Sequence, residues 1–349
     1  MMQKKNIAVI FGGCSPEYGV SLASASAVIG SMDRLQYRPV LVGITQQGDW
    51  FYYTGGVDRI LNNTWMGRDC VPACISPDRS RRALLVFGEN GVSQIHLDAA
   101  FPVLHGRNGE DGTVQGLLEL AGIPLAGCGA LASALCMDKD RAHRLASLAG
   151  ISVPKSFSVS AGYDRNEAAK QAEALGYPLF VKPVKAGSSY GVTKVSEPAH
   201  LWDAVENALY YDDRAMVEEA IPGVEVGCAV LGREDLTVGE PDEIELNGGF
   251  FDFREKYQML TAKIHVPARI SPEQRAMVQD AARVVYYALD CGGFARVDFF
   301  LTPEGTLLFN EVNTIPGFTA HSRYPSMMQG IGISFGELVT RLIELGVAG

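Results

Sequence analysis

The sequence predicts a mixed α/β and α+β protein that begins with a doubly wound parallel sheet. In the first third of the chain, short runs rich in β-branched and aromatic residues alternate with helix-like segments, as in NIAVIFGG followed by SLASASAVIGSM. Such alternation builds parallel sheets whose ligand-binding loops lie at the carboxyl ends of the strands. Later runs are joined by short turns, as in FARVDFFL, TPEG and TLLFNEVN, and these predict antiparallel hairpins.

The length of 349 residues exceeds what one hydrophobic core usually supports, so two or three packed domains are expected. We place an N-terminal domain at residues 1–123, a central lobe at 124–215 and a C-terminal lobe at 216–349. Within the last lobe, segment 248–267 is long for an irregular loop and predicts a functional lid. After it, Ser271 is expected to cap a helix that starts at Pro272.

Charge and cysteine content narrow the class of protein. The net charge of −10 and the scattered positions of the 30 lysines and arginines argue against nucleic acid and anionic membranes as partners. No apolar run is long enough to span a membrane. The seven cysteines form no C-x-x-C pair, which favours free thiols in a reducing cytoplasm over a zinc or disulfide framework.

The predicted hairpin near the C-terminus carries hard oxygen ligands in otherwise apolar strands. Glu311 and Asn313 are two residues apart and therefore share one face. If the turn centres on residues 303–304, Arg296 pairs with Glu311 and Asp298 lies diagonally across. Two carboxylates and an amide suit Mg²⁺, with Mn²⁺ as a possible substitute. The alternative, surface carboxylates balanced by Arg296, fits less well with the apolar neighbours on both strands.

A second candidate site combines Lys182 with the glycine-serine loop 187–191. Backbone N–H groups of such a loop can approach phosphate oxygens, although the P-loop pattern is absent. Taken alone, an ordinary flexible hairpin is an equally good interpretation. The magnesium-type hairpin further along the chain favours phosphate binding. Around Ile221, Glu218 and Glu225 could take an adenine amino group and ribose hydroxyls, or could simply form a solvated acidic turn.

The first strand ends in glycines but does not predict a dinucleotide site. The G-x-G-x-x-G spacing fails and no acidic residue ends the second strand, which excludes NAD. Glu17 at the end of the first strand is well placed to hold a substrate ammonium group. His105 opens a tight loop, 105–112, and is either a structural histidine or part of a substrate site.

Taken in order, these segments resemble the D-alanine–D-alanine ligase family of the ATP-grasp superfamily over essentially the whole chain. The matching strings are FGGCSPEYGVS, FPVLHGRNGEDG, MDKDR, VKPVKAGSSYG, FFDFREKY, FARVDFF and FNEVNTIPGFTAHSRYP. The resemblance is strongest to the VanG-type, D-serine-forming branch of the vancomycin-resistance ligases. It implies a pre-ATP-grasp domain followed by a two-lobed ATP-grasp fold, and a homodimer. It also implies ATP and two Mg²⁺ ions as cofactors, and D-alanine and D-serine as substrates for peptidoglycan precursors.

The resemblance also implies roles for individual residues. Those for the amino-acid substrates are Glu17, Ser188 and Tyr257 as a hydrogen-bonded relay, Arg296 and the Gly317 backbone as oxyanion donors, Ser322 on the second carboxylate, and His105, Lys256, Phe253 and Arg323 in the substrate pocket. Those for ATP are Lys139, Lys182, Ser188, Ser189, Glu218, Glu219, Ile221, Glu225, Lys256, Asn310 and Glu311. Those for the metal are Asp298, Glu311 and Asn313.

Four positions depart from the usual family pattern. Gly19 replaces an acidic residue two positions after Glu17, Phe251 and Phe253 stand where tyrosines are common, and Arg323 stands where D-alanine–D-alanine ligases carry leucine. A guanidinium there can reach a hydroxyl, which resembles the D-serine-forming branch, although a harmless, partly exposed arginine is the simpler interpretation.

The expected reaction is phosphorylation of D-alanine by ATP followed by attack of a second amino acid's amine. Four alternatives remain open. D-alanyl-D-alanine synthesis would use the same residues. A nucleotide-sensing protein on an inactive scaffold would predict a broken metal triad, whereas the triad is intact. A small-molecule kinase would release a phosphorylated product without needing an amine. A D-lactate product fits less well with the Lys256–Tyr257 pair.

Overall fold

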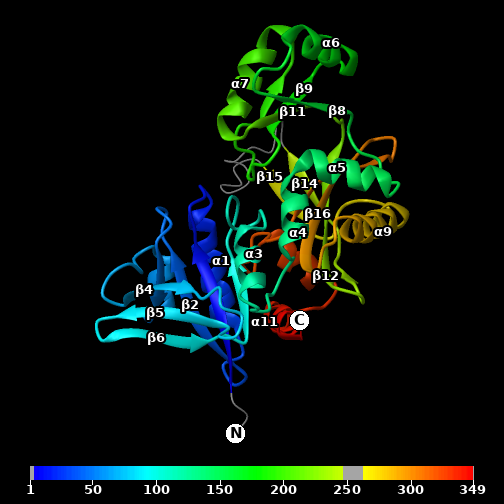
Figure 1. The fold of residues 1–349 in the computed structure, drawn as a ribbon. Helices are drawn as coiled ribbons and strands as arrows, with labels where there is room; N and C mark the ends of the chain where they lie inside the picture. Colours follow the sequence, from blue (N-terminus) through cyan, green and yellow to red (C-terminus); the bar gives the residue numbers. More distant parts are fainter. Residues whose placement is uncertain (1–3, 247–261, 349) are drawn as a thin grey trace.

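The computed structural model describes residues 4–246 and 262–348, which fold around three sheets (Figure 1). This confirms the predicted mixture of parallel and antiparallel sheets with helices. None of the helices in the described ranges combines the length and apolar character needed to cross a membrane.

The N-terminal sheet has seven strands in the order β6-β5-β4-β3-β2-β1-β7. They are β1 (Lys5–Gly12), β2 (Tyr37–Ile44), β3 (Trp50–Tyr53), β4 (Cys70–Ile75), β5 (Ala83–Gly88), β6 (Gly91–His96) and β7 (Ala99–Val103). Central strand β1 runs parallel to both β2 and β7, and its apolar core residues are fully buried, as the sequence predicts. Strands β3 to β6 extend this parallel centre as antiparallel neighbours. The helices are α1 (Tyr18–Ser31), α2 (Val57–Leu61) and α3 (Thr113–Leu120).

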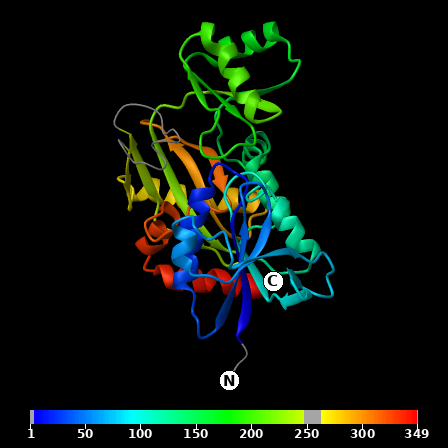
Figure 2. The ribbon, with the colours of Figure 1, turned by 90° about the vertical axis from the view of Figure 1, so that its left-hand side faces the viewer.

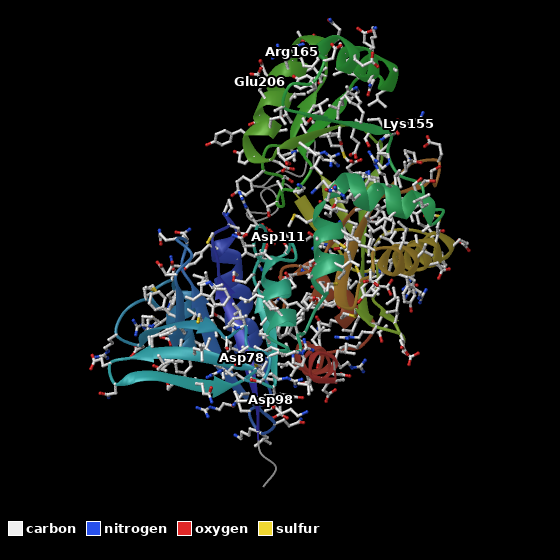
Figure 3. The ribbon with its side chains drawn as sticks, in the orientation of Figure 1. Asp78, Asp98, Asp111, Lys155, Arg165 and Glu206 are labelled. Atoms are coloured by element: carbon white, nitrogen blue, oxygen red, sulfur yellow. The ribbon has the colours of Figure 1, made fainter. Side chains whose placement is uncertain are left out.

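A four-stranded antiparallel sheet of order β10-β9-β11-β8 forms the outer lobe, green in Figure 1. Its strands are β8 (Ser156–Ser160), β9 (Leu179–Pro183), β10 (Thr193–Val195) and β11 (Arg214–Glu219), with helices α6 (Arg165–Leu175) and α7 (Leu201–Tyr211) and the short 3₁₀ helix η1 (Pro198–His200). Figure 3 shows Arg165 of α6 and Glu206 of α7 together on the outside of this lobe, where they form a 2.8 Å ion pair. The helices cover one face, so the other face of the sheet is left to form a wall toward the rest of the molecule.

The third sheet has six strands, with β15-β14-β12-β16-β17 in order and β13 paired to β12. They are β12 (Val224–Gly232), β13 (Thr237–Val238), β14 (Asp242–Leu246), β15 (Ala262–His265), β16 (Gly293–Leu301) and β17 (Leu307–Asn313). The associated helices are α4 (Ala130–Met137), α5 (Lys139–Leu148), α9 (Pro272–Ala288), α10 (Arg323–Gly330) and α11 (Phe335–Ala348). Helix α9 begins as predicted, with a capping box between Ser271 and Gln274.

Strand β15 corrects one expectation. Residues 248–267 were expected to be irregular throughout, but Ala262–His265 pair antiparallel with β14. A four-residue strand at the edge of a sheet is easily hidden in a loop-like sequence, because only one neighbour specifies it. Residues 248–261 of the expected lid lie outside the described residues.

The predicted hairpin forms, but in another register. Arg296 pairs with Asn313 rather than with Glu311, and Asp298 lies opposite Glu311. Two features cause the shift. The turn spans 302–306, where Gly305 adopts a φ of +85°. The ladder also has a bulge between Asp298 and Phe299, where Asn310 is the extra residue on β17. Their combined shift is two residues, which keeps the oxygen ligands on the expected face.

The N-terminal sheet and the third sheet share a core. Phe294 of β16 lies edge-on to Phe101 of β7, with centroids 6.1 Å apart, and to Phe318 and Tyr324. Helix α11 packs against both β7 and β16, and Figure 2 shows this red C-terminal segment beside the blue strands. We still propose three units. The second boundary is placed after Glu219, because the expected boundary at residue 215 falls inside β11.

Replacing Phe294 by alanine is expected to lower the free energy of unfolding by about 3–5 kcal/mol, because it empties the aromatic contact between the two sheets. Denaturant unfolding measures this loss. Phe87→Ala is the matched control, since Phe87 is 44% exposed, and it should change stability by less than about 1 kcal/mol. Equal losses in both variants would contradict a shared core at Phe294.

Candidate active site

A cavity of about 590 Å³ lies between the four-stranded sheet and the hairpin β16–β17. Eight residues predicted to bind ATP line it: Lys139, Lys182, Ser189, Glu218, Ile221, Glu225, Asn310 and Glu311. Lys194, for which the sequence pattern suggested no role, also lines it. Apolar side chains such as Phe180 and Phe300 complete the walls, so the cavity combines apolar surfaces with lysine side chains.

Lys182 and Glu218 face each other across neighbouring strands in this wall. Their positions on β9 and β11 are diagonal in the ladder, and Lys182 Nζ donates to Glu218 Oε1 at 2.7 Å. Both side chains are less than a tenth exposed. A buried ammonium and carboxylate of this kind are tolerable only as a pair, which fixes the lysine head group beside the cavity.

Lys139 enters the cavity from the first turn of α5. Asp138 separates α4 from α5, and its carboxylate accepts a hydrogen bond from the Arg141 N–H at 3.0 Å and caps α5. Lys139 Nζ lies 3.3 Å from Glu311 Oε2 and donates to the Ala186 carbonyl at 2.8 Å. Because α5 starts anew at this point, the Lys139 ammonium group lies beside Glu311 of the hairpin β16–β17.

The glycine-serine loop separates this cavity from a second one of about 500 Å³. Ser188 faces the second cavity and Ser189 faces the first, and both adopt left-handed φ angles, +50° and +59°. Such angles are uncommon for serine and cost free energy unless the surrounding structure holds them. The Ser188 hydroxyl donates to Glu17 Oε1, which ties the partition to the N-terminal domain.

The second cavity brings together most residues predicted to bind the amino acids: Glu17, His105, Ser188, Arg296, Gly317, Ser322 and Arg323. Glu17 reaches it because β1 ends in glycines. At Gly12, φ is +91° and a Cβ atom would lie 2.1 Å from the Ile44 carbonyl oxygen, so only glycine fits this turn. Gly19, the departure from the family pattern, also lines this cavity.

His105 is held from two sides. Its Nδ1 lies 2.8 Å from the Ile315 carbonyl, and the Ser15 hydroxyl donates to the His105 carbonyl at 2.6 Å. Burial lowers the pKa of His105, so the ring is neutral near pH 7. It therefore links the N-terminal domain to the segment that precedes Gly317.

The oxygen ligands share one face of the hairpin, where Glu311 lines the first cavity, Asn313 lines the second and Asp298 is buried beside them. Asp298 is fully buried, and it accepts hydrogen bonds from Arg296 to both oxygens, at 2.8 and 2.7 Å, and from Asn313 Nδ2 at 3.0 Å. Burial alone would raise the pKa of Asp298, but Arg296 and Arg323 hold it below its ordinary value. Asp298, Glu311 and Asn313 thus present oxygen donors of the kind Mg²⁺ prefers. Within the described residues, no group of three His, Cys, Asp or Glu side chains could hold a metal ion by itself. Mg²⁺ sites of this kind commonly add phosphate oxygens of the substrate to one or two carboxylates.

Asp242 is a residue that sequence reasoning missed. It is fully buried on β14, and Arg323 donates to its two oxygens at 2.6 and 2.8 Å. The same guanidinium lies 3.3 Å from Asp298 and 3.4 Å from Glu225. Arg323 is therefore a buried arginine that contacts three carboxylates, and not the partly exposed arginine of the simpler interpretation. No local signal marks Asp242, because its partner is 81 positions away.

Glu110 is a second residue that was missed, although it lies within the HGRNGEDG segment. Its oxygens accept the Gly106 N–H at 2.7 Å and the Ile315 N–H at 3.2 Å. Its desolvated position and the neighbouring Glu17 raise the pKa of Glu110 to about 8. Its spacing of five residues from His105 in a glycine-rich turn was the available signal.

The remaining predicted residues lie elsewhere. Glu219 does not line the cavity between the four-stranded sheet and the hairpin β16–β17, which we call the nucleotide-type cavity. Its carboxylate accepts the Lys155 N–H at 2.8 Å and secures the start of β8. Phe251, Phe253, Lys256 and Tyr257 fall outside the described residues.

Comparison with known proteins gives one family for both halves of the chain. The family described as D-ala D-ala ligase N-terminus matches residues 6–128, and D-ala D-ala ligase C-terminus matches residues 145–344. The solved VanG D-Ala:D-Ser ligase from Enterococcus faecalis is 55% identical, with a TM-score of 0.92 and coverage of 98% of this chain and 99% of that one. The vancomycin C-type resistance protein VanC1 of Enterococcus gallinarum is 43% identical over 98% of both chains. A putative D-alanine–D-lactate ligase of Streptomyces coelicolor is 44% identical over 100% of this chain and 99% of its own length.

The raised pKa of Glu110 predicts a pH dependence of stability in the ligand-free protein. The folded pKa of about 8 lies above the ordinary 4.5, so the contribution of Glu110 is complete below about pH 4.5 and is lost as the pH rises through about 8. Glu110→Gln should remove this decline in the free energy of unfolding, measured by denaturant titration at several pH values. Glu89→Gln, in an exposed turn, is the control and should keep the wild-type profile. An unchanged decline in Glu110→Gln would contradict the assignment.

Proposed function

The chain belongs to the D-alanine–D-alanine ligase family of ATP-dependent ligases, and from this we propose that it joins D-alanine to D-serine through a D-alanyl phosphate. The observation that carries the proposal is the pair of adjoining cavities, with lysines suited to phosphate in one and Arg323, held by the buried Asp242, in the wall of the other. Peptidoglycan precursors ending in D-serine, and with them vancomycin resistance, are the proposed outcome.

The first step places ATP in the cavity beside the four-stranded sheet. Lys139 and Lys182 would neutralise phosphate charge, and Glu225 would hold the ribose. Mg²⁺, when bound by Asp298, Glu311 and Asn313, supplies charge neutralisation for the transferring phosphoryl group. The carboxylate of D-alanine then attacks the γ-phosphate, and positioning by this chain's residues supplies most of the acceleration.

Glu17 would hold the ammonium group of the first D-alanine. Its bond from Ser188 keeps the carboxylate at the partition between the cavities, so the substrate's own carboxylate can point toward the phosphates. Arg296 and the Gly317 backbone would stabilise the oxyanion that forms when the second amine attacks. The family resemblance gives Lys256 and Tyr257, which lie outside the described residues, the proposed role of excluding water from the acyl phosphate.

The second substrate's side chain would meet Arg323, whose guanidinium is held in place by Asp242. A hydroxyl can accept a hydrogen bond from the guanidinium, whereas a methyl group cannot. Ser322 would grip its carboxylate, since the hydroxyl lies in the same cavity and bonds Thr319 at 2.8 Å. The identity of 55% to a D-Ala:D-Ser ligase supports this choice. D-alanine as the second substrate remains the closest alternative, and the relative named as a D-lactate ligase makes D-lactate a third.

The test is ADP release with Mg-ATP and D-alanine, with and without D-serine, followed by identification of the product. D-alanyl-D-serine as the main product would support the whole proposal. D-alanyl-D-alanine alone, or a D-lactate ester when D-lactate is offered, would retain the mechanism and overturn the role given to Arg323. Absence of amine-dependent turnover would favour a nucleotide-sensing protein.

Arg323→Leu is expected to shift the product ratio from D-alanyl-D-serine toward D-alanyl-D-alanine by about tenfold or more, because the hydroxyl loses a charged hydrogen-bond donor. Competition assays with equal D-alanine and D-serine measure the ratio. Arg269→Leu is the matched control, since Arg269 is a half-exposed arginine paired with Glu243. An unchanged ratio in Arg323→Leu would sink the specificity assignment.

Asp298→Asn is expected to lower kcat by at least about a hundredfold, because it removes a metal ligand and leaves Arg296 without its carboxylate. Chelation of divalent cations should abolish wild-type turnover, and excess Mg²⁺ should restore it. Asp235→Asn, in an exposed turn, serves as the control. Metal-independent turnover would contradict the site.

A further inference from the structure

His143 is a buried histidine that the reaction described above leaves without a role. It lies one turn after Lys139 on α5, so the two side chains share a face of the helix. His143 is only 3% exposed, and its ring packs edge-on against Phe309 with centroids 5.5 Å apart. It lies between β11 and β17, next to Glu218 and Asn310, which both line the nucleotide-type cavity.

The two ring nitrogens face different sheets. Nε2 lies 2.8 Å from the carbonyl oxygen of Asn310, the bulge residue beside Glu311. Nδ1 lies 3.8 Å from Glu218 Oε2 on β11. A single side chain thus touches the strand that carries the metal-type ligands and the strand that carries the partner of Lys182.

The bond to Asn310 defines the tautomer. A carbonyl oxygen can only accept, so Nε2 carries the proton. Burial lowers the pKa of His143, which keeps the ring neutral and leaves Nδ1 as an acceptor. Nδ1 and Glu218 Oε2 are both buried, and neither has a hydrogen-bond partner within the described ranges.

This arrangement constrains Glu218. The ring occupies the space beside Oε2 and offers no donor there, so the carboxylate depends on Lys182 for compensation of its charge. The facing groups are Glu218 on β11, Lys182 on β9 and Lys139 on α5. The imidazole of His143 therefore sets the distance between the Lys182–Glu218 pair and the Asn310 carbonyl.

We propose that His143 is a positioning residue that spaces the two walls of the nucleotide site and keeps Lys182 in register with the metal-binding hairpin. The inference deepens the proposed function and rests on it for the identity of the ligand. It predicts that His143 acts on nucleotide affinity while leaving the amino-acid cavity unchanged.

The test compares His143→Leu with His143→Gln in the full chain. Leucine fills the volume but removes both nitrogens, whereas glutamine can place an amide N–H near the position of Nε2. We expect His143→Leu to weaken Mg-ADP binding, measured by calorimetry, and to raise the KM for ATP by about tenfold each, while the KM for D-alanine changes less than about twofold. His143→Gln should recover to within about threefold of wild type. His200→Leu, at an exposed histidine of the outer lobe, is the control.

The outcomes separate the inference from the function beneath it. A lower melting temperature with unchanged ADP affinity and ATP KM, or glutamine no better than leucine, would overturn the positioning role. If wild type binds Mg-ADP but makes no dipeptide, the proposed reaction fails and the binding measurements still decide the role of His143. If wild type binds no nucleotide, both are overturned.

Discussion

The buried charge cluster around Asp298 is the constraint on which the rest of the site depends. Two carboxylates, Asp298 and Asp242, are fully buried and are matched by Arg296 and Arg323. Removing one member of such a cluster leaves an uncompensated charge in a low-dielectric interior, at a cost of about 3–5 kcal/mol. The four residues come from β14, β16 and α10, so the charge balance requires all three elements to be in place.

The cluster also explains why the two cavities meet where they do. Arg323 lies 3.4 Å from Glu225, which lines the nucleotide-type cavity, while Arg323 itself lines the other. On the opposite side, Ser188 and Ser189 form the partition and Ser188 bonds to Glu17. The junction is therefore stabilised by side-chain ion pairs around Arg323 and by the loop of Ser188 and Ser189, whose backbone is strained. Both are means of fixing reacting groups at short range without apolar packing between them.

Much of this could be read from the sequence because the chemistry is local. Glu311 and Asn313 share a face through the period of a strand, and Lys182 precedes a glycine-serine loop by only a few residues. What could not be read depends on long-range geometry. The bulge at Asn310 changes the register of the hairpin, and nothing in FNEVN marks it before the strands pair. Asp242 stands among alternating acidic residues, and only folding selects it as the partner of Arg323.

Because Arg323 is buried, its proposed effect on the choice of substrate differs from that of an exposed arginine. An exposed arginine would add a hydrogen bond and could be removed at little cost. Here the guanidinium is 9% exposed and its donors already serve Asp242 and Asp298. A substrate hydroxyl would therefore join an existing network of charges, whose strength is greatest where water is excluded. In the proposed function, selectivity for a hydroxyl would come from the penalty of leaving that network incomplete beside a methyl group, as much as from the new bond. Because Arg323 also lies 3.3 Å from Asp298, a change at position 323 would alter the charge balance of Asp298, and the proposed substrate preference would be coupled to catalytic power.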